Sequence, residues 1–585
     1  MKFSTLADYM ERIESTSKRL EMIDTTKQLF LEADENEIGQ ICYFLLGSLG
    51  PDYAGIEIGM AERLAMRSMA KAAGTDELTV ERKLKEKGDL GQAAFELLKN
   101  RKMRKLVSKE LTVSKCYDSI LELSKLSGKK STMQKIDGLA SLLVDMSPEE
   151  GKYLVRYVTG ELRLGLADMT LLDALSEAFA GGRESRNEAE DAYNIRPEIG
   201  YIARVMKSQG LKGLRNIKIQ IGIPIRMELA ERLSSAKEIA EKVGIPCGVE
   251  YKYDGERIQA HKKGNELVLF SRRLERITHQ YPDVVGLLRK NIKTKDAIVE
   301  MECVAIDSET GEIRPFQELM QRRRKYEIEK MMHAIPVNLK LFDVLYIDGK
   351  VLMKAPYDER RKALERIVIQ DDNVQLSKMI LAESPQDIER FFEEAIEEGM
   401  EGVMVKMLKS EYEAGARSFR WVKLKREYKA KIEDTLDLVI VGAYRGMGKR
   451  AQFKYGSFLM AIYDPDSDTF KTTTRVGTGF TEEDLKRLGE MLETDLVSEK
   501  PPRVDSKVEP DYWFRPSVVL EIIGAEVTLS PTHNAAMGVI KKDAGLAIRF
   551  PRFTGKYRID KKPEDATTEK ELIEFYQDKL RKISE

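Results

Sequence analysis

Cysteine is scarce in this chain, and the few cysteines lie far apart. Among 585 residues there are four, namely Cys42, Cys116, Cys247 and Cys303. Their spacing excludes a zinc site built from neighbouring residues, and it argues against a disulfide framework. We therefore expect four buried free thiols.

Long apolar runs are also missing. The longest are fragments such as residues 41–46, far below the length of about 20 residues that crosses a bilayer. Residues 1–5 lack the apolar core of a secretion signal. These absences predict a protein that works inside the cell and does not span a membrane.

Neither sign of charge dominates. Charged residues make up 33% of the chain, but 97 lysines and arginines nearly balance 98 acidic residues. Net charge therefore gives no sign of nucleic-acid binding, which would have to use local basic patches. A chain of 585 residues is too long for one hydrophobic core, so about three domains are expected.

The spacing of apolar residues divides the chain into three parts. Residues 1–220 carry apolar side chains at helical spacing, which predicts an all-α domain. In this part Ser147, Pro148 and Glu150 have the pattern of a capped helix start. Residues 221–431 alternate short strands with helices, which predicts an α+β domain.

Residues 432–585 contain mainly strand candidates. These lie at 437–444, 457–463, 470–476 and 518–527. Helices are expected at 482–492 and at 569–583. A small β-barrel with an inserted helix and a C-terminal helix fits this pattern.

One stretch of the middle part could supply a nucleophile. Residues 248–252 read as a strand that ends at Lys252, Tyr253-Asp254-Gly255 as a turn, and residues 257–261 as the second strand of a hairpin. A lysine at the inner end of a hairpin is held rigidly and can be partly desolvated. Desolvation lowers the pKa of an amine and makes it nucleophilic. The alternative is a surface hairpin that happens to carry a lysine, and these residues alone do not decide.

Two acidic residues and an aromatic residue follow. A strand predicted at 298–307 places Glu300 and Glu302 on one face. Two carboxylates at such a short distance repel each other unless a cation or a metal lies between them. Alternatively, one of them points to solvent and pairs with a lysine. Phe342 could stack on a base, although a place in the core is the commoner fate.

Cationic side chains flank these acids. Arg272 and Arg273 follow a strand, and their guanidinium groups suit phosphate or ribose oxygens. Glu401 and Lys406 bracket a short apolar strand. This segment again combines an acid and a lysine with a buried strand.

The next strand candidate carries further cations. Trp421, Lys423 and Lys425 share one of its faces, and Arg417 lies just before it. Neighbouring lysines repel each other, so an anion is expected between them. A lysine nucleophile, carboxylates for a divalent metal and cations for phosphates, all within the middle part of the chain, together indicate nucleotidyl transfer.

Two spots in the helical part could touch phosphates. Lys129-Lys130-Ser131 leads into a helix, where cationic side chains would lie beside free backbone amides. Arg163 lies in a loop between two helices. Solvated turns are the simpler interpretation of both spots.

These motifs together resemble the ATP-dependent DNA ligases of the archaeal and eukaryotic replicative type, with the archaeal form fitting best. The family's nucleophile motif is matched by Lys252-Tyr253-Asp254-Gly255 with Arg257. Further motifs are matched by residues 271–273, the strand with Glu302, Phe342-Asp343, and residues 315–325, 401–406, 421–425, 549–552 and 558–561. Residues 160–165 resemble the family's helical DNA-binding domain.

The resemblance implies a fold and a reaction. The three parts would be a helical DNA-binding domain (1–220), an adenylation domain (221–431) and an OB-fold domain with a C-terminal helix (432–585). Lys252 would attack ATP and carry AMP, the AMP would pass to the 5′-phosphate at a nick, and the 3′-hydroxyl would then seal the strand. Mg²⁺ would assist.

The resemblance also assigns roles to residues. Glu250 would bind the adenine edge, Phe342 would stack on the base, and Glu302 would hold the ribose and later a metal. Glu401 would help to hold Mg²⁺. The sugar and phosphates would be surrounded by Arg257, Arg272, Arg417, Lys423 and Lys425. DNA contacts would come from Lys129, Lys130, Ser131 and Arg163.

The expected partner is nicked double-stranded DNA, bound by a monomer associated with the nucleoid in a prokaryotic cytoplasm, in replication, repair and recombination. Two departures from the family pattern stand out. Met301 replaces the usual glycine before Glu302, and residues 101–107 lack the glutamine and aromatic residue that bind a sliding clamp in archaeal relatives. Clamp binding is therefore left open. An RNA-capping guanylyltransferase is the alternative, but it is not expected to carry a large helical domain.

Overall fold

The structure is a computed structural model of the 585-residue chain. It describes the chain except residues 102–109, 129, 307–312, 315, 324–327, 399, 426–434, 447–449, 451, 525, 531, 550 and 585. Contacts divide the chain into two compact units, Met1–Glu81 with Ala93–Ala430, and Arg82–Gln92 with Lys431–Glu585. No helix in the described part is long and apolar enough to cross a membrane.

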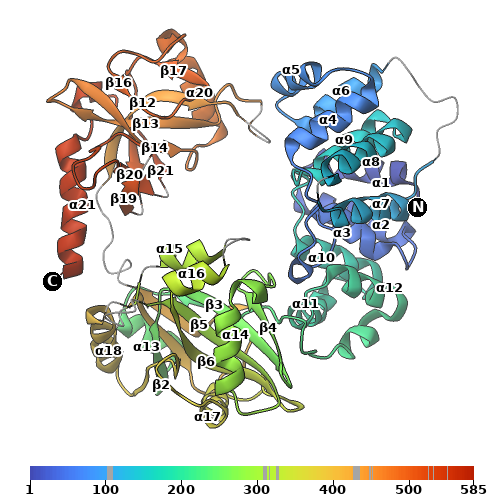
Figure 1. Cartoon of the computed structure of the whole chain (residues 1–585), viewed down its shortest axis with the longest axis vertical. Helices are drawn as coiled ribbons and strands as arrows, with labels where there is room; N and C mark the ends of the chain where they lie inside the picture. Colours follow the sequence, from blue (N-terminus) through green and yellow to red (C-terminus); the bar gives the residue numbers. More distant parts are fainter. Residues whose placement is uncertain are drawn as a thin grey trace. The chain divides into compact units, whose positions relative to one another are not determined.

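The N-terminal part is helical, as its apolar spacing predicts (Figure 1). Its α-helices are α1 (Phe3–Glu14), α2 (Arg19–Glu32), α3 (Ile38–Leu46), α4 (Glu62–Ala73), α5 (Glu77–Lys87), α6 (Leu90–Lys99), α7 (Val113–Lys125), α8 (Ser131–Asp145), α9 (Pro148–Val158), α10 (Asp168–Phe179), α11 (Arg186–Ile195) and α12 (Ile199–Arg215). Short 3₁₀ turns lie at η1 (Asp52–Ala54) and η2 (Arg183–Ser185). The helix start predicted at Ser147 is confirmed, because Ser147 and Glu150 form a reciprocal capping box with Pro148 in the first turn.

The central part contains two β-sheets. The first has the order β1-β11-β10-β2-β9, and β1 runs parallel to β11. Its strands are β1 (Leu229–Arg232), β2 (Cys247–Lys252), β9 (Met379–Ala382), β10 (Gly402–Met407) and β11 (Arg417–Lys425). The second has the order β4-β3-β5-β6-β7, with β8 beside β6. Its strands are β3 (Glu256–Lys263), β4 (Glu266–Ser271), β5 (Asp296–Ala305), β6 (Val337–Ile347), β7 (Lys350–Val351) and β8 (Val374–Leu376).

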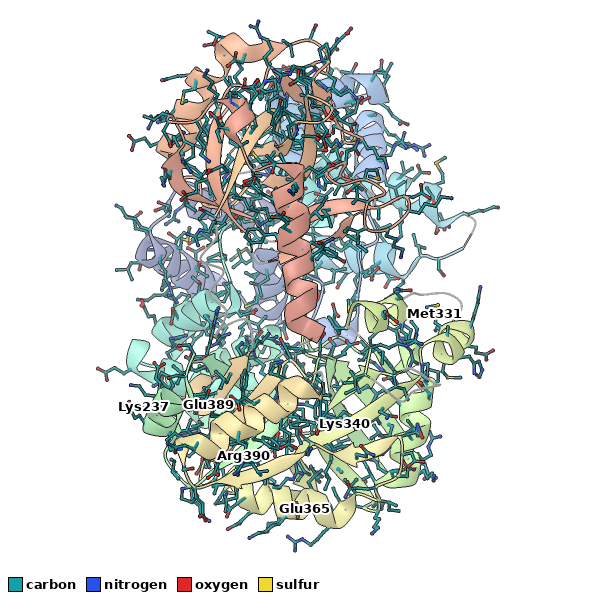
Figure 2. The ribbon with its side chains drawn as sticks, turned by 90° about the vertical axis from the view of Figure 1, so that its left-hand side faces the viewer. Lys237, Met331, Lys340, Glu365, Glu389 and Arg390 are labelled. Atoms are coloured by element: carbon teal, nitrogen blue, oxygen red, sulfur yellow. The ribbon has the colours of Figure 1, made fainter. Side chains whose placement is uncertain are left out.

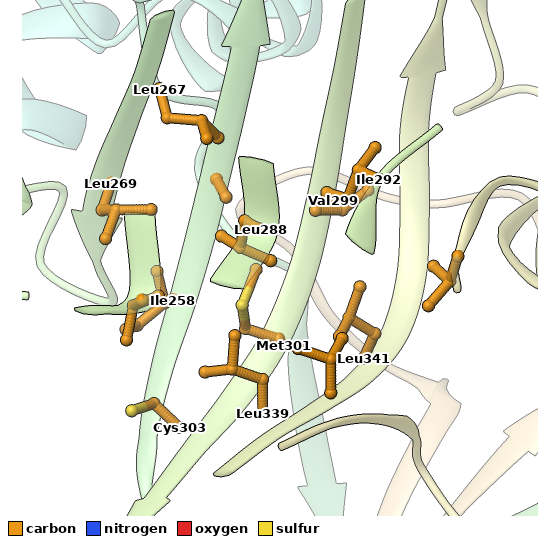
Figure 3. Close-up of a cluster of buried hydrophobic side chains, with 14 of the residues drawn as sticks. Ile258, Leu267, Leu269, Leu288, Ile292, Val299, Met301, Cys303, Leu339 and Leu341 are labelled. Atoms are coloured by element: carbon orange, nitrogen blue, oxygen red, sulfur yellow. The ribbon is translucent and has the colours of Figure 1, made fainter. Parts of the chain in front are cut away.

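Helices cover one face of each sheet. The face of the second sheet packs on α14 (Pro282–Asn291) and α17 (Tyr357–Ile367), and Figure 3 shows Leu288 of α14 among Met301, Leu339 and Leu341. The first sheet packs on α13 (Ala236–Val243) and α18 (Pro385–Glu397). Charged residues such as Glu365 and Arg390 lie on the exposed sides of α17 and α18 (Figure 2). Shorter segments are η3 (Thr278–Gln280), α15 (Phe316–Leu319), η4 (Met320–Arg323) and α16 (Ile328–Ala334).

The faces that these helices leave uncovered turn toward each other. Trp421 of the first sheet meets Phe342 of the second, with ring centroids 6.2 Å apart. Ile298, Leu345 and Met404 belong to the same small apolar cluster. The space between the two sheets is therefore partly apolar and partly free for polar side chains.

The hairpin expected around Lys252 is wrong. Both strands and the bend between them exist, but β2 pairs with β9 and β10, whereas β3 pairs with β4 and β5. The chain crosses from one sheet to the other at residues 253–255. Gly255 permits this crossing, because a Cβ there would lie 2.4 Å from the carbonyl oxygen of Cys303. Lys252 thus lies at the junction of two sheets.

The C-terminal part is rich in curled sheets. The larger sheet has the order β15-β17-β12-β13-β14-β16, and β18 joins β12 to β21; β19 and β20 form a separate pair. The strands are β12 (Leu436–Tyr444), β13 (Ser457–Asp464), β14 (Thr469–Val476), β15 (Leu496–Val497), β16 (Val504–Asp505), β17 (Tyr512–Phe514), β18 (Val519–Ile523), β19 (Glu526–Ser530), β20 (Gly545–Arg549) and β21 (Arg552–Tyr557). Helices α20 (Glu482–Met491) and α21 (Glu569–Ser584) and the turns η6 (Glu493–Asp495) and η7 (Pro563–Asp565) complete it.

Two expectations at this level have clear outcomes. The single strand predicted at 518–527 is wrong, because β18 and β19 belong to different sheets. Both halves are apolar enough to read as one run, and the sequence does not show where the chain leaves the first sheet. All four cysteines are buried free thiols, as expected.

Candidate active site

One face of the first sheet carries a cluster of charged side chains. Residues directly opposite each other on neighbouring strands share a face. The register of β2, β10 and β11 therefore forms three rows across this face: Lys252, Gly402 and Lys425; Glu250, Met404 and Lys423; and Gly248, Lys406 and Trp421.

The second sheet supplies the opposite wall. In its register Arg257 of β3 lies opposite Glu302 of β5, and Gln259 lies opposite Glu300. Between the walls lies a cavity of about 570 Å³, a size typical of small-molecule sites. Its lining includes Glu250, Lys252, Arg257, Arg272, Arg273, Glu302, Phe342, Glu401, Lys406, Trp421, Lys423 and Lys425.

Glu401 connects two lysines at one end of this cavity. Its carboxylate forms ion pairs with Lys252 and with Lys425, one through each oxygen. All three side chains are only about one-fifth exposed. The shared carboxylate therefore holds both lysine side chains side by side at the cavity wall.

Glu250 lies at the other end and is almost fully buried. One carboxylate oxygen accepts hydrogen bonds from the hydroxyl of Tyr357 and from Nη1 of Arg361, and the other lies 2.9 Å from Nζ of Lys406. Burial lowers the pKa of Lys406, although Glu250 opposes this shift. The Lys406 ammonium also faces the rings of Phe342, Tyr357 and Trp421. Glu250 is thus a rigidly held acceptor next to an aromatic surface.

Arg257 is the cation between the two acids of β5. Its Nη2 donates to Glu300 at 2.7 Å and its Nη1 donates to the carbonyl of Glu228 at 2.7 Å. Desolvation opposes its charge, but Glu300 and Glu302 help to hold the pKa of Arg257 above its ordinary value. The cation or metal expected between Glu300 and Glu302 is therefore, in this structure, a guanidinium group.

Glu302 and Lys423, which also line the cavity, have shifted pKa values as well. Desolvation raises the pKa of Glu302 to about 7, even though Lys252 and Arg257 act in the opposite direction. Desolvation, with Lys252 and Arg417 nearby, lowers the pKa of Lys423. A carboxyl group that titrates near neutral pH beside several cations is typical of a functional site.

Known proteins resemble this chain along its whole length. Three family models match it, described as DNA ligase N terminus (residues 2–176), ATP dependent DNA ligase domain (227–425) and ATP dependent DNA ligase C terminal region (451–561). DNA ligase 2 of Thermofilum pendens is 51% identical, over 98% of this chain and 97% of its own. The chain belongs to the family of ATP-dependent DNA ligases.

Further comparisons agree with this membership. A probable DNA ligase of Aquifex aeolicus is 47% identical to this ligase over 98% of both chains. The solved structure Pmar-Lig_Pre aligns with 95% of this chain and 99% of its own chain at a TM-score of 0.55 and 15% identity, which shows a shared fold.

Most of the residues singled out from the sequence meet in the cavity of this ligase. Phe342 is 9% exposed and belongs both to the apolar cluster and to the cavity wall, so its place in the core is confirmed, whereas stacking on a base stays a prediction. Arg417 is different, because it is exposed at the start of β11 and is not among the lining residues. It is nevertheless close enough to act on the charge of Lys423.

The expected DNA-contact residues lie in the helical part. Lys130 and Ser131 stand at the start of α8, where Lys130 makes no capping hydrogen bond with its side chain. Arg163 has a positive φ of 58° and forms an ion pair with Glu161. Lys129 lies outside the described residues.

Several residues around the site were missed from the sequence. Tyr357 and Arg361 hold Glu250, and Arg360 forms a fully buried ion pair with Asp343. Tyr412 donates to Glu300 at 3.1 Å. These partners lie more than 15 residues apart in the chain, so no local pattern joins them. The adjacent arginines of α17 on a buried helix face are the one signal that could have drawn attention.

Proposed function

We propose that this ligase seals nicks in duplex DNA through AMP carried on Lys252. The observation that carries the proposal is the cavity between the two sheets. It brings Lys252, several carboxylates and several cations together around a space of about 570 Å³. Such a site suits a nucleoside triphosphate, whose base, ribose and phosphates need different partners.

The nucleotide would lie along the three rows of the first sheet. Adenine would stack on Phe342 and donate its 6-amino hydrogens to Glu250. The ribose would contact Glu302 and Arg257. The phosphates would lie among Arg272, Arg417, Lys423 and Lys425, with Lys425 beside the α-phosphate.

The residues present fit a divalent cation. Glu302 and Glu401 line the same cavity as Lys252. The described residues contain no group of three or more acidic, histidine or cysteine side chains that could hold a metal alone. Mg²⁺ usually takes one or two carboxylates together with substrate phosphates, so these two carboxylates suffice. When bound, Mg²⁺ would neutralise charge on the phosphates and occupy the carboxylate that otherwise pairs with Lys252.

The first step is nucleophilic substitution at the α-phosphorus. Lys252 loses a proton, its Nζ forms a bond to the α-phosphorus, and the bond from that phosphorus to the pyrophosphate oxygen breaks. In the second step an oxygen of the 5′-phosphate at the nick displaces Lys252 from AMP. In the third, the 3′-hydroxyl attacks that 5′-phosphate, loses its proton and releases AMP. Lys423 and Lys425 would stabilise the charge that develops on phosphate oxygens.

DNA would be held by the helical and C-terminal parts. Lys130, Ser131, Arg163 and, outside the described residues, Lys129 are proposed to contact backbone phosphates. We assign the helical DNA-binding domain to residues 1–220, the adenylation domain to 221–431 and an OB-fold to 432–585. The curled sheets of the last part support the OB-fold. The motif at residues 549–552 and 558–561 would orient the leaving pyrophosphate.

The cellular setting follows from the substrate. A monomer acting on nicked DNA in the nucleoid of a prokaryote would serve replication, repair and recombination. Binding to a sliding clamp stays untested, because residues 102–107 of the relevant segment lie outside the described residues.

The proposal is tested with two substrates and one variant. Lys252→Ala should abolish AMP attachment and the sealing of an ordinary nick. It should retain measurable sealing of a nick that already carries AMP on its 5′-phosphate, because the third step does not use the amine. Lys263→Ala, an exposed lysine at the end of β3, is the control and should behave as the wild type. Labelling by GTP in place of ATP would favour a guanylyltransferase, and normal AMP attachment by Lys252→Ala would refute the proposal.

A further inference from the structure

A short extended segment is fastened to the cavity wall. This segment, residues 222–228, precedes β1, and we call it the strap. Arg257, Gln259 and His261 alternate along β3 and so project from the same face. All three side chains form hydrogen bonds with the strap. The intervening residues Ile258 and Ala260 point to the other face of the sheet and belong to its core.

The bonds to the strap have defined directions. The amide N–H of Gly222 donates to Nδ1 of His261 at 3.0 Å. The amide N–H of Ile225 donates to Oε1 of Gln259 at 2.8 Å, and Nε2 of Gln259 donates to the carbonyl of Ile225 at 3.1 Å. This pair of bonds fixes which end of the Gln259 side chain is the oxygen and which is the nitrogen.

The same side chains also bond to one another. Because Nδ1 of His261 accepts a hydrogen bond, its proton lies on Nε2, which donates to Oε1 of Gln259 at 2.9 Å. Burial lowers the pKa of His261 to about 3, so the neutral ring required by this arrangement is the stable form. Nε2 of Gln259 then donates to Oε1 of Glu300 at 3.1 Å.

The chain of bonds ends at a group of the active site. The other oxygen of Glu300 accepts from Nη2 of Arg257 at 2.7 Å, and Nη1 of Arg257 returns to the strap at the carbonyl of Glu228. Glu300 is fully buried, so its carboxylate oxygens depend on these donors and on Tyr412 for hydrogen bonds. Among the described residues, Nε of Arg257 is buried without a hydrogen-bond acceptor, so the guanidinium depends on Glu300 and the strap for its orientation.

We propose that Gln259 is a positioning residue for Arg257 in the transfer of AMP to Lys252. Gln259 holds the carboxylate of Glu300 in one orientation, and Glu300 in turn fixes the guanidinium of Arg257 at the cavity wall. His261 contributes by holding the Gln259 amide. The inference rests on the proposed function, since it concerns the same reaction.

The alternative role of Gln259 is purely structural, as a clamp between the strap and β3. The two roles differ in one respect. A clamp contributes to stability but does not act through Arg257. If Gln259 acts by positioning Arg257, its substitution should have no further effect on the reaction rate in a protein that already lacks the Arg257 side chain.

The test is a double-mutant cycle with Arg257→Met, Gln259→Met and the double variant. The measured quantity is the single-turnover rate of AMP attachment to Lys252 over a range of ATP concentrations, in the full-length protein. Gln259→Met should slow attachment by about 10- to 100-fold, the usual cost of misplacing a reacting or binding group. The double variant should be no slower than Arg257→Met. Losses that multiply in the double variant, or an unchanged rate in Gln259→Met, would overturn the proposal.

Lys262→Met is the matched control. Lys262 is also buried on β3, but it donates to the carbonyl of Thr294 and does not line the cavity. Its loss should lower the unfolding temperature and leave the rate of AMP attachment unchanged.

Two measures keep the test decisive if Gln259→Met folds poorly. Tyr412→Phe removes only the hydroxyl that donates to Glu300 and keeps the ring, so it replaces Gln259→Met in the same cycle with the same expected non-additivity. The wild type is measured in parallel. An absence of AMP on Lys252 in the wild type would refute the proposed function, whereas additive losses with an active wild type would refute only the role of Gln259.

Discussion

The electrostatic state of single residues decides when the site can react. Lys252 and Lys425 share the carboxylate of Glu401, which holds both side chains in position. Glu302 differs, because burial makes its ionisation difficult near neutral pH. The two acids therefore lie in different environments, because Glu401 pairs with two lysines whereas Glu302 is desolvated.

Glu302 gives a pH prediction for the reaction. Its folded pKa of about 7 lies above the ordinary value of 4.5, so the folded protein binds this proton more tightly than the unfolded chain. Ionised Glu302 therefore accumulates only as the pH rises through about 7. If the carboxylate is the active form, kcat/KM for AMP attachment should rise over this range in the wild type.

The matched variant is Glu302→Gln. At high pH, AMP attachment should be slower in this variant than in the wild type. The ratio of the wild-type rate to the variant rate should decrease as the pH falls below 7. A ratio that stays constant from pH 6 to pH 8 would show that Glu302 does not titrate during catalysis.

At the scale of elements, the crossing from β2 to β3 brings Lys252 to the cavity. Gly255→Ala would place a methyl group 2.4 Å from the carbonyl oxygen of Cys303 and 2.9 Å from the side chain of Val304. We expect a loss of stability of about 1–3 kcal/mol, the usual cost of overpacking, together with slower AMP attachment as Lys252 shifts.

Gly286→Ala is the control for this substitution. Gly286 lies in α14, and a Cβ there meets nothing within 4 Å. Alanine should stabilise the helix by up to about 1 kcal/mol without changing the reaction. Chemical denaturation and single-turnover labelling measure both effects. Equal stability of the two variants would contradict the close approach of β3 to β5.

A partly buried cluster of ion pairs joins α1 to α9 in the helical part. Glu14 accepts from Arg156 at 2.9 Å and from the hydroxyl of Tyr153 at 2.7 Å, and it lies 2.7 Å from Nζ of Lys152. Although desolvation opposes it, these partners lower the pKa of Glu14 to about 2. The stabilisation is present above the ordinary pKa of 4.5 and is lost as the pH falls toward 2.

Glu14→Gln should therefore lower the free energy of unfolding at neutral pH, on the order of 2 kcal/mol. The difference from the wild type should disappear as the pH approaches 2. Denaturation followed by helical circular dichroism from pH 7 to pH 2.5 measures this. A difference that persists unchanged at pH 3 would mean that Glu14 is not held by Arg156 and Lys152.

The sequence predicted single elements better than it predicted their partners. Strands at 248–252, 402–406 and 437–444 agree with the structure within one or two residues, because each has a local apolar pattern. The hairpin at Lys252 failed for a physical reason. The sequence pattern of two strands joined by a polar turn with glycine is the same in two cases. The strands can pair with each other in a hairpin, or they can belong to different sheets.

In the candidate site, too, single residues were easier to predict from the sequence than the contacts between them. Lys252, Glu302 and Lys423 belong to short motifs and were found, whereas Tyr357 and Gln259 act through partners in distant segments. The replacement of glycine by Met301 is accommodated because its side chain is fully buried in the core of the second sheet, away from the cavity.

At the scale of the whole molecule, binding to the nick should be governed by phosphate contacts rather than by net charge, which is close to zero. Each phosphate that is neutralised releases counterions, so the affinity for nicked DNA should fall by about three orders of magnitude between 50 and 200 mM salt. AMP attachment without DNA should change far less over this range, which provides an internal control. A flat binding curve would contradict a role of Lys130 and Arg163 in holding the DNA backbone.

The central claim is that AMP is carried on Lys252. It is tested most directly by incubating the full-length protein with ATP, GTP or NAD, each labelled in the adenylate or guanylate phosphate, and mapping the modified peptide by mass spectrometry. The account predicts AMP on Lys252 from ATP, with pyrophosphate released in equal amount, and loss of the label on addition of nicked DNA. Label on another residue, or label from GTP instead of ATP, would contradict it.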